Sequence, residues 1–145
     1  FIKPSIRLSP EKLMKNVSEV MTRNVLTCSP DDEIDNIWRL MQTRSFAGLP
    51  VVKKDKLVGI ITQKDLLKSG ASMPTFESEK GRFRAPTKIS SIMKTQVVAV
   101  KPQIKVIRVA KIMVSKDVGR VPVIDEEGKL IGIVDREDVA KLVVK

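Results

Sequence analysis

The sequence predicts an α+β fold built from two similar repeats, each with the order β-α-β-β-α. Three observations support this prediction: an internal repeat, short β-branched runs joined by polar turns, and apolar residues at helical spacing. Hydrophobic residues make up 42% of the 145-residue chain, which is enough for a core. One repeat of about 55 residues buries too little surface to be stable alone, so we expect the two repeats to pack sheet to sheet.

The opening segments of the two repeats match almost position by position. Residues 17–41, VSEVMTRNVLTCSPDDEIDNIWRLM, align with residues 89–113, ISSIMKTQVVAVKPQIKVIRVAKIM. Met21 meets Met93 at an offset of 72, and a proline and a second methionine keep the same offset. Self-similarity at a fixed offset indicates two copies of one structural unit.

A strand and a helix should open each repeat. The β-branched runs at residues 25–28 and 97–100 predict strands, and a proline that fits the first turn of a helix follows each run. In the first copy Ser29 is a good N-cap, so we expect the helix to begin at Pro30. Apolar residues then recur at helical spacing, and we expect Trp38 among them to lie in the core.

A hairpin and a second helix complete each repeat. Residues 49–67, LPVVKKDKLVGIITQKDLL, align with residues 121–140, VPVIDEEGKLIGIVDREDVA. The apolar runs flank a short polar turn, which predicts a β-hairpin. One extra residue in the second turn changes the offset to 73, and turns tolerate such insertions. Helices are expected at residues 63–69 and 136–143.

These elements divide the chain into four parts. Residues 1–16 form an N-terminal lead-in, which we expect to be helical from Pro10. The first repeat spans residues 17–68 and the second spans residues 89–143. Residues 69–88, which are rich in Gly, Pro, Ser and charge, predict an exposed linker.

Composition argues against several classes of function. The chain has no His, which removes Ser-His-Asp and Cys-His catalysis and the usual zinc sites. No nucleophile stands beside a base, so we expect neither an enzyme nor a metal site. The single Cys28 favours a reducing, cytoplasmic setting, and we expect its thiol to be buried and inert. No apolar run approaches the length of a membrane span.

The net charge of +10 leaves two readings open. It could mark a surface that binds polyanions such as nucleic acid, or it could reflect an ordinary lysine-rich, solvated surface. With four Phe and one Trp, base stacking on an aromatic platform is not expected, although basic residues alone can hold phosphate backbones. The basic residues around the linker are Lys80, Arg82, Arg84, Lys88 and Lys94.

Two related heptapeptides, GIITQKD at residues 59–65 and GIVDRED at residues 132–138, follow the hairpins. Thr62 and Asp65 fit a capping box, in which each side chain bonds the backbone N–H of the other residue. Asp135 takes the place of threonine in the second copy and is itself a good N-cap. A helix N-terminus also presents N–H groups to an anion, so the cap and a ligand site are compatible.

Taken together, these motifs strongly resemble a tandem pair of CBS domains, the Bateman module, over residues 17–68 and 89–143. The resemblance implies pseudo-twofold packing of the repeats, frequent homodimers, and a prokaryotic stand-alone protein or part of a longer one. It also implies a non-catalytic regulator that binds adenosine-containing ligands, such as AMP, ADP, ATP or S-adenosylmethionine, in two clefts. GIITQKD fits the family's ligand motif in full, whereas GIVDRED departs from it at Asp135.

The same resemblance implies the site residues, with Asp65 and Asp138 as ribose acceptors and Thr62 as a phosphate contact. The first cleft would combine Thr62, Asp65, Ala47 and Gly48 with Ser90, Thr95 and Val118; the second would combine Asp135, Asp138, Gly119 and Arg120 with Ser18, Arg23 and Phe46. Arg120 is either a phosphate contact or an ordinary exposed arginine. A ligand-free dimerisation module stays open as an alternative.

The two clefts should differ in the ligand charge that they tolerate. An ionised Asp135 about 4 Å from a phosphate would cost about 4 kcal/mol at an effective dielectric constant of about 20. Arg120 could offset a similar amount. We therefore expect phosphorylated adenosines to prefer the cleft with Thr62 and Asp65, and the other cleft to be empty, weak or selective for ligands with little negative charge.

Overall fold

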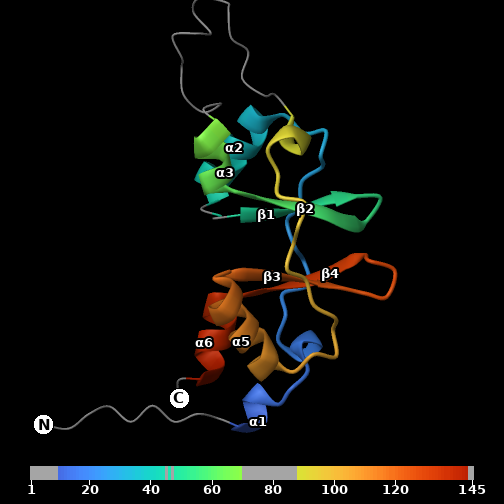
Figure 1. Ribbon diagram of the computed structural model, residues 1–145, viewed down its shortest axis with the longest axis vertical. Helices are drawn as coiled ribbons and strands as arrows, with labels where there is room; N and C mark the ends of the chain where they lie inside the picture. Colours follow the sequence, from blue (N-terminus) through green and yellow to red (C-terminus); the bar gives the residue numbers. More distant parts are fainter. Residues whose placement is uncertain (1–9, 45, 47, 70–87, 144–145) are drawn as a thin grey trace, which may run out of the picture. The chain divides into compact units, whose positions relative to one another are not determined.

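The computed structural model describes residues 10–44, 46, 48–69 and 88–143. The chain forms two compact units that each combine segments from both repeats: unit 1 contains Phe1–Val25 and Val98–Lys145, and unit 2 contains Leu26–Val97. Figure 1 shows the blue N-terminal segment beside the orange and red elements, and the yellow segment beside the green ones. Most of the predicted linker lies outside the described residues, as does Ala47.

Unit 2 contains a two-stranded antiparallel sheet flanked by helices. Its elements are α2 (Ile34–Arg44), β1 (Gly48–Lys53), β2 (Lys56–Thr62), α3 (Gln63–Ser69) and the 3-10 helix η2 (Ile89–Ser91). Leu49, Ile61 and Leu66 are fully buried in its core, and Trp38 is partly buried against them. The predicted hairpin and second helix are confirmed.

Unit 1 repeats this arrangement with the second copy. Its elements are α1 (Pro10–Leu13), the 3-10 helix η1 (Val17–Glu19), α5 (Val106–Lys116), β3 (Arg120–Ile124), β4 (Leu130–Asp135) and α6 (Arg136–Val143). Val106, Val109 and Val121 are fully buried, and Leu13 of α1 lies in the same core. The predicted α+β fold class, the hairpin and the helix from Pro10 are confirmed.

The opening segment of each repeat docks on the other repeat through backbone hydrogen bonds. In unit 2, Ser90 N donates to the carbonyl of Pro30 at 2.9 Å. In unit 1, Ser18 N donates to the carbonyl of Pro102 at 3.1 Å, which is the same contact with the two repeats exchanged. Neither unit is therefore made from one repeat alone.

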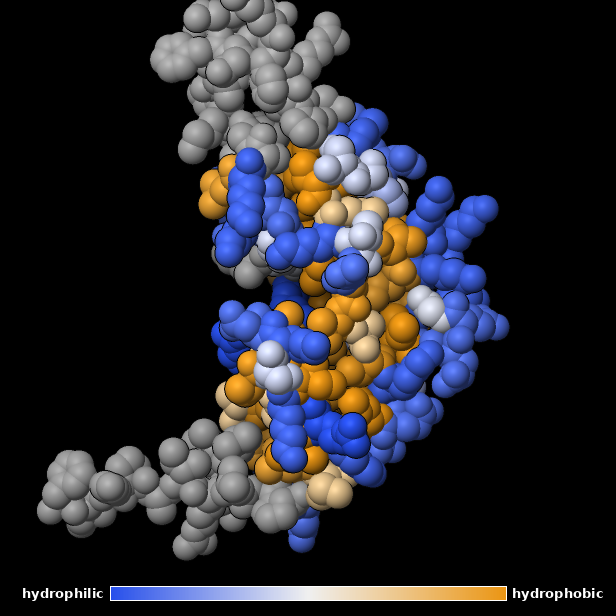
Figure 2. Space-filling model, viewed as in Figure 1, coloured by the Kyte–Doolittle hydropathy of each residue, from blue (hydrophilic) through white to orange (hydrophobic). Residues whose placement is uncertain are grey.

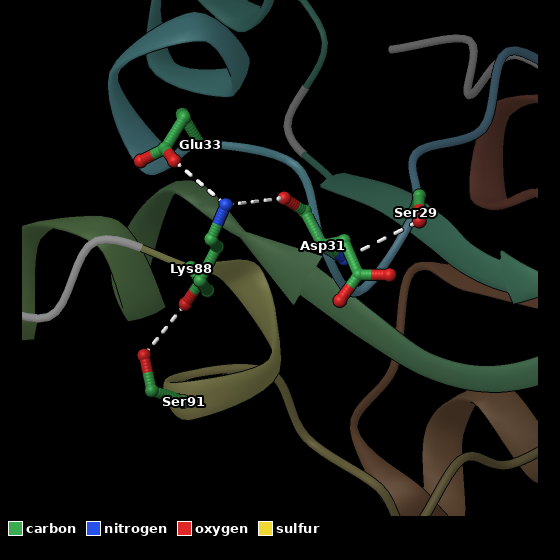
Figure 3. Close-up of polar contacts among 5 residues, drawn as sticks. All are labelled: Ser29, Asp31, Glu33, Lys88 and Ser91. Carbon is green, nitrogen blue, oxygen red and sulfur yellow. Dashed lines mark hydrogen bonds and ion pairs between the residues drawn. The ribbon is translucent and has the colours of Figure 1, made fainter.

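Side chains reinforce the docking in unit 2 (Figure 3). Lys88 Nζ lies 2.8 Å from Glu33 Oε1 and donates to the carbonyl of Asp31 at 3.2 Å, while Ser91 Oγ donates to the carbonyl of Lys88 at 2.6 Å. The hydrogen bond with Glu33 is the main cause of a raised pKa for Lys88. Both partners of this pair are about half exposed, so it contributes little to stability.

The motif glycines bring the opening segments against the hairpins. A Cβ at Gly59 would lie 2.8 Å from the carbonyl oxygen of Lys94 and 2.8 Å from Met93 Sδ. A Cβ at Gly132 would overlap the side chain of Met21 in the same way. The glycine of each heptapeptide is therefore required for close packing of the other repeat's methionine and backbone.

Two local predictions were wrong. The first helix of each repeat begins four residues later than expected, at Ile34 and Val106. Ser29 instead closes a turn, because its N–H donates to Asp32 Oδ2 at 2.7 Å and its carbonyl accepts the Asp32 N–H at 3.0 Å. The predicted opening strands are single parallel bridges. Within residues 25–28 and 97–100, only Cys28 and Val100 pair with a hairpin strand. Burial raises the pKa of the Cys28 thiol to about 12, consistent with an inert side chain.

The two hairpin turns differ in length. Both are hydrophilic (Figure 2). The turn of unit 2 places Lys54 and Asp55 at φ of 51° and 67°, which is the left-handed region. The longer turn of unit 1 uses Gly128 at φ of 84°, and the Asp125 carboxylate accepts the N–H of Lys129 at 2.9 Å. The extra residue of the second copy is thus accommodated by a glycine in a left-handed conformation.

Candidate functional site

The corner between β2 and α3 holds the first candidate site. Thr62 N donates to Asp65 Oδ2 at 3.0 Å, and Thr62 Oγ1 donates to the same oxygen at 2.9 Å. Asp65 N donates back to Thr62 Oγ1 at 3.2 Å. These reciprocal bonds form the predicted capping box, so the structural role of the motif is confirmed.

Asp65 is buried, with 8% of its surface exposed, which is unusual for a carboxylate. Its Oδ2 accepts the bonds from Thr62, while its Oδ1 lies 3.8 Å from Lys94 Nζ. Lys94 comes from the second repeat and is half exposed, so its ammonium group can reach solvent or a ligand. The site therefore presents one oriented carboxylate and one adjustable cation.

Sequence reasoning did not identify Lys94 as a partner of Asp65. It treated Lys94 only as one member of a basic cluster. No sequence signal pointed to the pairing, because Lys94 approaches Asp65 only through the tertiary contact of Met93 and Lys94 with Gly59. The backbone of Lys94 bonds that of Ile60 in both directions, each at 2.9 Å, and this fixes where its side chain starts.

The corner between β4 and α6 holds the second candidate site. Asp135 N donates to Asp138 Oδ2 at 3.0 Å, so the cap is kept in the second copy. Asp135 Oδ1 lies 2.9 Å from Arg120 Nε in an ion pair. These two atoms are shielded from solvent. Their contact is an ion pair, because its geometry does not meet that of a hydrogen bond. Arg120 is thus not an ordinary exposed arginine.

Competing effects act on the Asp135 carboxyl. Burial raises its pKa above the ordinary value, the positive charge of Arg120 lowers it, and the neighbouring Asp138 and Glu137 raise it. The net direction is upward. The ionised form of Asp135 is therefore less favourable here than in water, even with Arg120 beside it.

The strand registers place the differing residues of the two copies opposite each other. Gly48 faces Thr62 across β1 and β2, and Arg120 faces Asp135 across β3 and β4. A neutral pair in one hairpin thus replaces a charged pair in the other. The change from Gly48 to Arg120 and the change from Thr62 to Asp135 therefore occur at facing positions of the hairpin.

The structure brings other predicted residues into the same units. Ser90 and Thr95 belong to unit 2 with Thr62, and both are exposed. Ser18 and Arg23 belong to unit 1 with Asp138, and Arg23 Nη2 donates to the carbonyl of Ser18 at 3.1 Å.

The remaining predicted residues are backbone or apolar contacts. The carbonyl of Gly119 accepts the N–H of Arg136 at 2.8 Å, and the carbonyl of Phe46 accepts a hydrogen bond from the Gln63 side chain at 2.9 Å. Val118 belongs to unit 1 and Phe46 to unit 2. Their assignment to the clefts with Thr62 and with Asp135, respectively, stays a prediction.

A separate apolar groove of about 440 Å³ lies between α5 and α6 in unit 1. Its lining residues are Ala110, Met113, Val114, Asp117, Arg136, Val139 and Ala140. It contains none of the predicted ligand-binding residues. Val114 on its rim is 84% exposed, which is high for a large aliphatic side chain.

The described residues bear on three other functions, which are metal binding, membrane spanning and polyanion binding by the predicted basic cluster. Among residues 10–44, 46, 48–69 and 88–143 there is no group of three or more His, Cys, Asp or Glu side chains that could hold a metal ion. No helix in these ranges is long and apolar enough to cross a membrane. Lys88 and Lys94 of the basic cluster are in ion pairs, and the other three members lie outside the described residues.

Fold and site together define a tandem-repeat module with a capped hairpin-to-helix corner in each compact unit. The family model for the CBS domain matches residues 17–72 and 89–145. The chain therefore belongs to the CBS-domain family and contains a tandem pair, as the sequence motifs predicted.

Relatives of known sequence include proteins longer than this chain. Protein MJ1225 of Methanocaldococcus jannaschii is 34% identical over 141 residues, which cover 94% of this chain and 50% of that protein. Inosine-5′-monophosphate dehydrogenase of the same organism is 34% identical over 129 residues, which cover 88% of this chain and 23% of the enzyme. The chain thus spans about half of one relative and a quarter of the other.

Solved structures show the same fold. The crystal structure of MJ1225 matches with a TM-score of 0.78, covering 88% of this chain and 47% of that one. CBSX2, solved in complex with AMP, matches with a TM-score of 0.75 at 25% identity, covering 88% and 94%. The CBS domain pair of protein MJ0100, solved with 5′-methylthioadenosine and S-adenosyl-L-methionine, matches with a TM-score of 0.71 at 25% identity, covering 89% and 95%.

Proposed function

We propose that this chain is a non-catalytic regulatory module that senses adenosine-containing ligands such as AMP, ADP, ATP or S-adenosylmethionine. The observation that carries the proposal is the buried carboxylate of Asp65, held in one orientation by Thr62 with a second-repeat lysine beside it. Membership of the CBS family and the adenosine compounds bound by CBSX2 and MJ0100 support it.

In the site of unit 2, Asp65 acts as the acceptor for ribose hydroxyl groups. Its Oδ2 is occupied by Thr62, so Oδ1 is the oxygen offered to the ligand. The hydroxyl of Thr62 rotates from Asp65 to a phosphate oxygen, and Lys94 moves with it to neutralise the phosphate charge. Charge-assisted hydrogen bonds of this kind are stronger than neutral ones.

In the site of unit 1, Asp138 takes the ribose role, and Ser18 and Arg23 of the same unit complete the site. Its Oδ2 accepts the Asp135 N–H just as Asp65 accepts that of Thr62. The position of the threonine hydroxyl is taken by a carboxylate, so this site is the weaker one for phosphorylated ligands. This asymmetry is the chain's own departure from the family pattern.

The module regulates a partner protein or an attached domain in the cytoplasm and works as a homodimer. The exposed Val114 beside the apolar groove of α5 and α6 supports a dimer contact, because burying such a side chain stabilises association. A molar mass of one chain in light scattering at all concentrations would contradict the dimer.

A thermal-unfolding screen tests the proposed function. Ligands that bind only the folded chain raise its stability in proportion to the logarithm of their excess over Kd. AMP and ATP should be compared with GMP and GTP, and S-adenosylmethionine should be compared with adenosine. We expect stabilisation by at least one adenosine compound and none by its guanosine counterpart.

Two variants give that screen its control. Asp65→Ala should remove the stabilisation by AMP, whereas Asp35→Ala, which removes an exposed carboxylate of α2 in the same unit, should keep it. Equal behaviour of all adenosine and guanosine compounds would contradict the proposal. A salt-dependent gel shift with nucleic acid, but no response to any nucleotide, would favour the polyanion-binding alternative.

A further inference from the structure

Two facing residues at the end of each hairpin have equivalent positions in the strand register but differ in charge. In unit 2, Gly48 and Thr62 are a neutral pair across β1 and β2. In unit 1, Arg120 and Asp135 occupy the equivalent register positions and form an ion pair of 2.9 Å. The substitution of both partners together keeps each hairpin locally neutral.

The charge of Arg120 is therefore already engaged by Asp135. The Arg120 side chain is about one-fifth exposed and the Asp135 side chain about two-fifths, so the attraction between them is screened less than that of a surface pair. A phosphate that approached this corner would meet Arg120 and the Asp135 carboxylate at the same time. Its attraction to one would be offset by repulsion from the other.

The charges around the two corners reinforce this contrast. The first three residues of α6 are Arg136, Glu137 and Asp138, with a net negative charge, whereas the first three residues of α3 contain Lys64 and Asp65, whose charges balance. Lys94 then supplies unit 2 with a cation close to its carboxylate. The corner of unit 2 is the more favourable of the two for an anion.

We propose that this facing pair sets the ligand charge that each site accepts: Gly48 with Thr62 admits a 5′-phosphate, whereas Arg120 with Asp135 selects an adenosyl compound whose 5′ group carries no negative charge. The inference rests on the proposed function, because it assigns a substrate class to each of its two sites. A neutral hydroxyl or thioether, or a sulfonium cation, meets no repulsion from Asp135. A hydroxyl can also donate a hydrogen bond to it.

The test reads one site at a time. In the Asp65→Ala background, which disables unit 2, titration calorimetry measures the affinity of unit 1 for adenosine and for AMP. We expect adenosine to bind more tightly than AMP. Adding Arg120→Gly and Asp135→Thr together should raise the affinity for AMP relative to adenosine by at least about tenfold.

A matched double variant controls for the loss of any ion pair. Lys101 and Glu126 form an exposed ion pair of 3.9 Å at the turn of the same unit. Lys101→Gly with Glu126→Thr removes the same kinds of charge and leaves the net charge unchanged. It should leave the ratio of adenosine to AMP affinity within about twofold of the background value.

A second variant covers the case in which the exchanged unit 1 does not fold. Thr62→Asp, placed in the Asp138→Ala background, keeps an N-cap while adding a carboxylate to unit 2. We expect it to lower AMP affinity by at least about tenfold and to keep adenosine binding. If the parent backgrounds bind adenosine compounds but neither exchange changes the AMP-to-adenosine ratio, the charge selection is wrong and the proposed function stands. If the wild-type chain binds no adenosine compound, both are wrong.

Discussion

Replacing Gly59 of the first heptapeptide by alanine should separate two parts of unit 2 that are far apart in sequence. The added Cβ of Gly59→Ala would lie 2.8 Å from the carbonyl oxygen of Lys94 and 2.8 Å from Met93 Sδ. The sulfur belongs to a flexible side chain and can move, but the carbonyl is part of the backbone. The substitution therefore has to push the opening segment of the second repeat away from β2.

The cost follows from the contacts that this displacement disturbs. Two backbone hydrogen bonds of 2.9 Å join Ile60 and Lys94, and each contributes about 1 kcal/mol. Forcing a methyl group into a packed interior costs about 1–3 kcal/mol in addition. We expect Gly59→Ala to lower the free energy of unfolding by about 3 kcal/mol, which is a large share of a typical domain's stability.

Urea denaturation followed by circular dichroism measures this change. Gly119→Ala is the matched control, because its Cβ would meet Arg136 at an ordinary 3.5 Å and should change stability by less than about 0.5 kcal/mol. Gly132→Ala, which is crowded by Met21, should behave like Gly59→Ala. A Gly59→Ala variant as stable as the Gly119→Ala control would refute the close-packing role of the motif glycine.

Three further predictions concern the turn, the ion pair and the exchange of segments. Gly128→Ala should lower the free energy of unfolding by about 1–2 kcal/mol, because a side chain is disfavoured at φ of 84°. The added Cβ would meet no atom within 4 Å, so backbone strain is the cause of this loss. An unchanged free energy of unfolding in urea denaturation would contradict this prediction. The pKa of Asp135, measured by NMR titration, should lie above 3.8 and should rise further in Arg120→Met. Because the pKa is higher in the folded than in the unfolded chain, the stability from this group is present below the unfolded pKa. That stability is lost as pH rises through the folded pKa. A fall in that pKa on loss of Arg120 would show that the guanidinium is not its counter-ion. Fragments 1–78 and 79–145 produced together should co-purify, because residues 17–25 complete unit 1 and residues 88–97 complete unit 2; folded fragments recovered separately would argue against the exchange.

The hairpins and the helices after them could be predicted from the sequence because local signals agree there. Short runs rich in β-branched residues, polar turns and the capping residues are local signals for the hairpins and helices of residues 48–69 and 120–143. The repeat also identified the family, since two copies in register are far more specific than one. These parts of the structure are those in which local and global preferences coincide.

The exchange of opening segments could not be predicted in the same way. Nothing local shows that Ser90 bonds the Pro30 carbonyl of the other repeat, because that contact depends on tertiary packing. The helix start was misplaced for a related reason: the Asp32 side chain captures the Ser29 N–H and closes a separate turn before the helix. Proline and serine alone fit both arrangements.

Part of the candidate site could be predicted from local sequence, and part depends on tertiary packing. The Thr62–Asp65 cap could be predicted from spacing, and the residue contrast between Thr62 and Asp135 was visible in the repeat. The ion pair of Arg120 with Asp135 and the approach of Lys94 to Asp65 depend on strand register and docking. These two contacts give the two candidate sites different electrostatics.

Titration calorimetry with AMP on the wild-type chain, Asp65→Ala and Asp138→Ala tests the central claim most directly. The claim is that this CBS pair binds phosphorylated adenosines through the corner of unit 2. We predict that Asp65→Ala abolishes AMP binding and that Asp138→Ala leaves it within about threefold of wild type. Equal loss of AMP binding in both variants, or no AMP binding to the wild-type chain, would contradict the account.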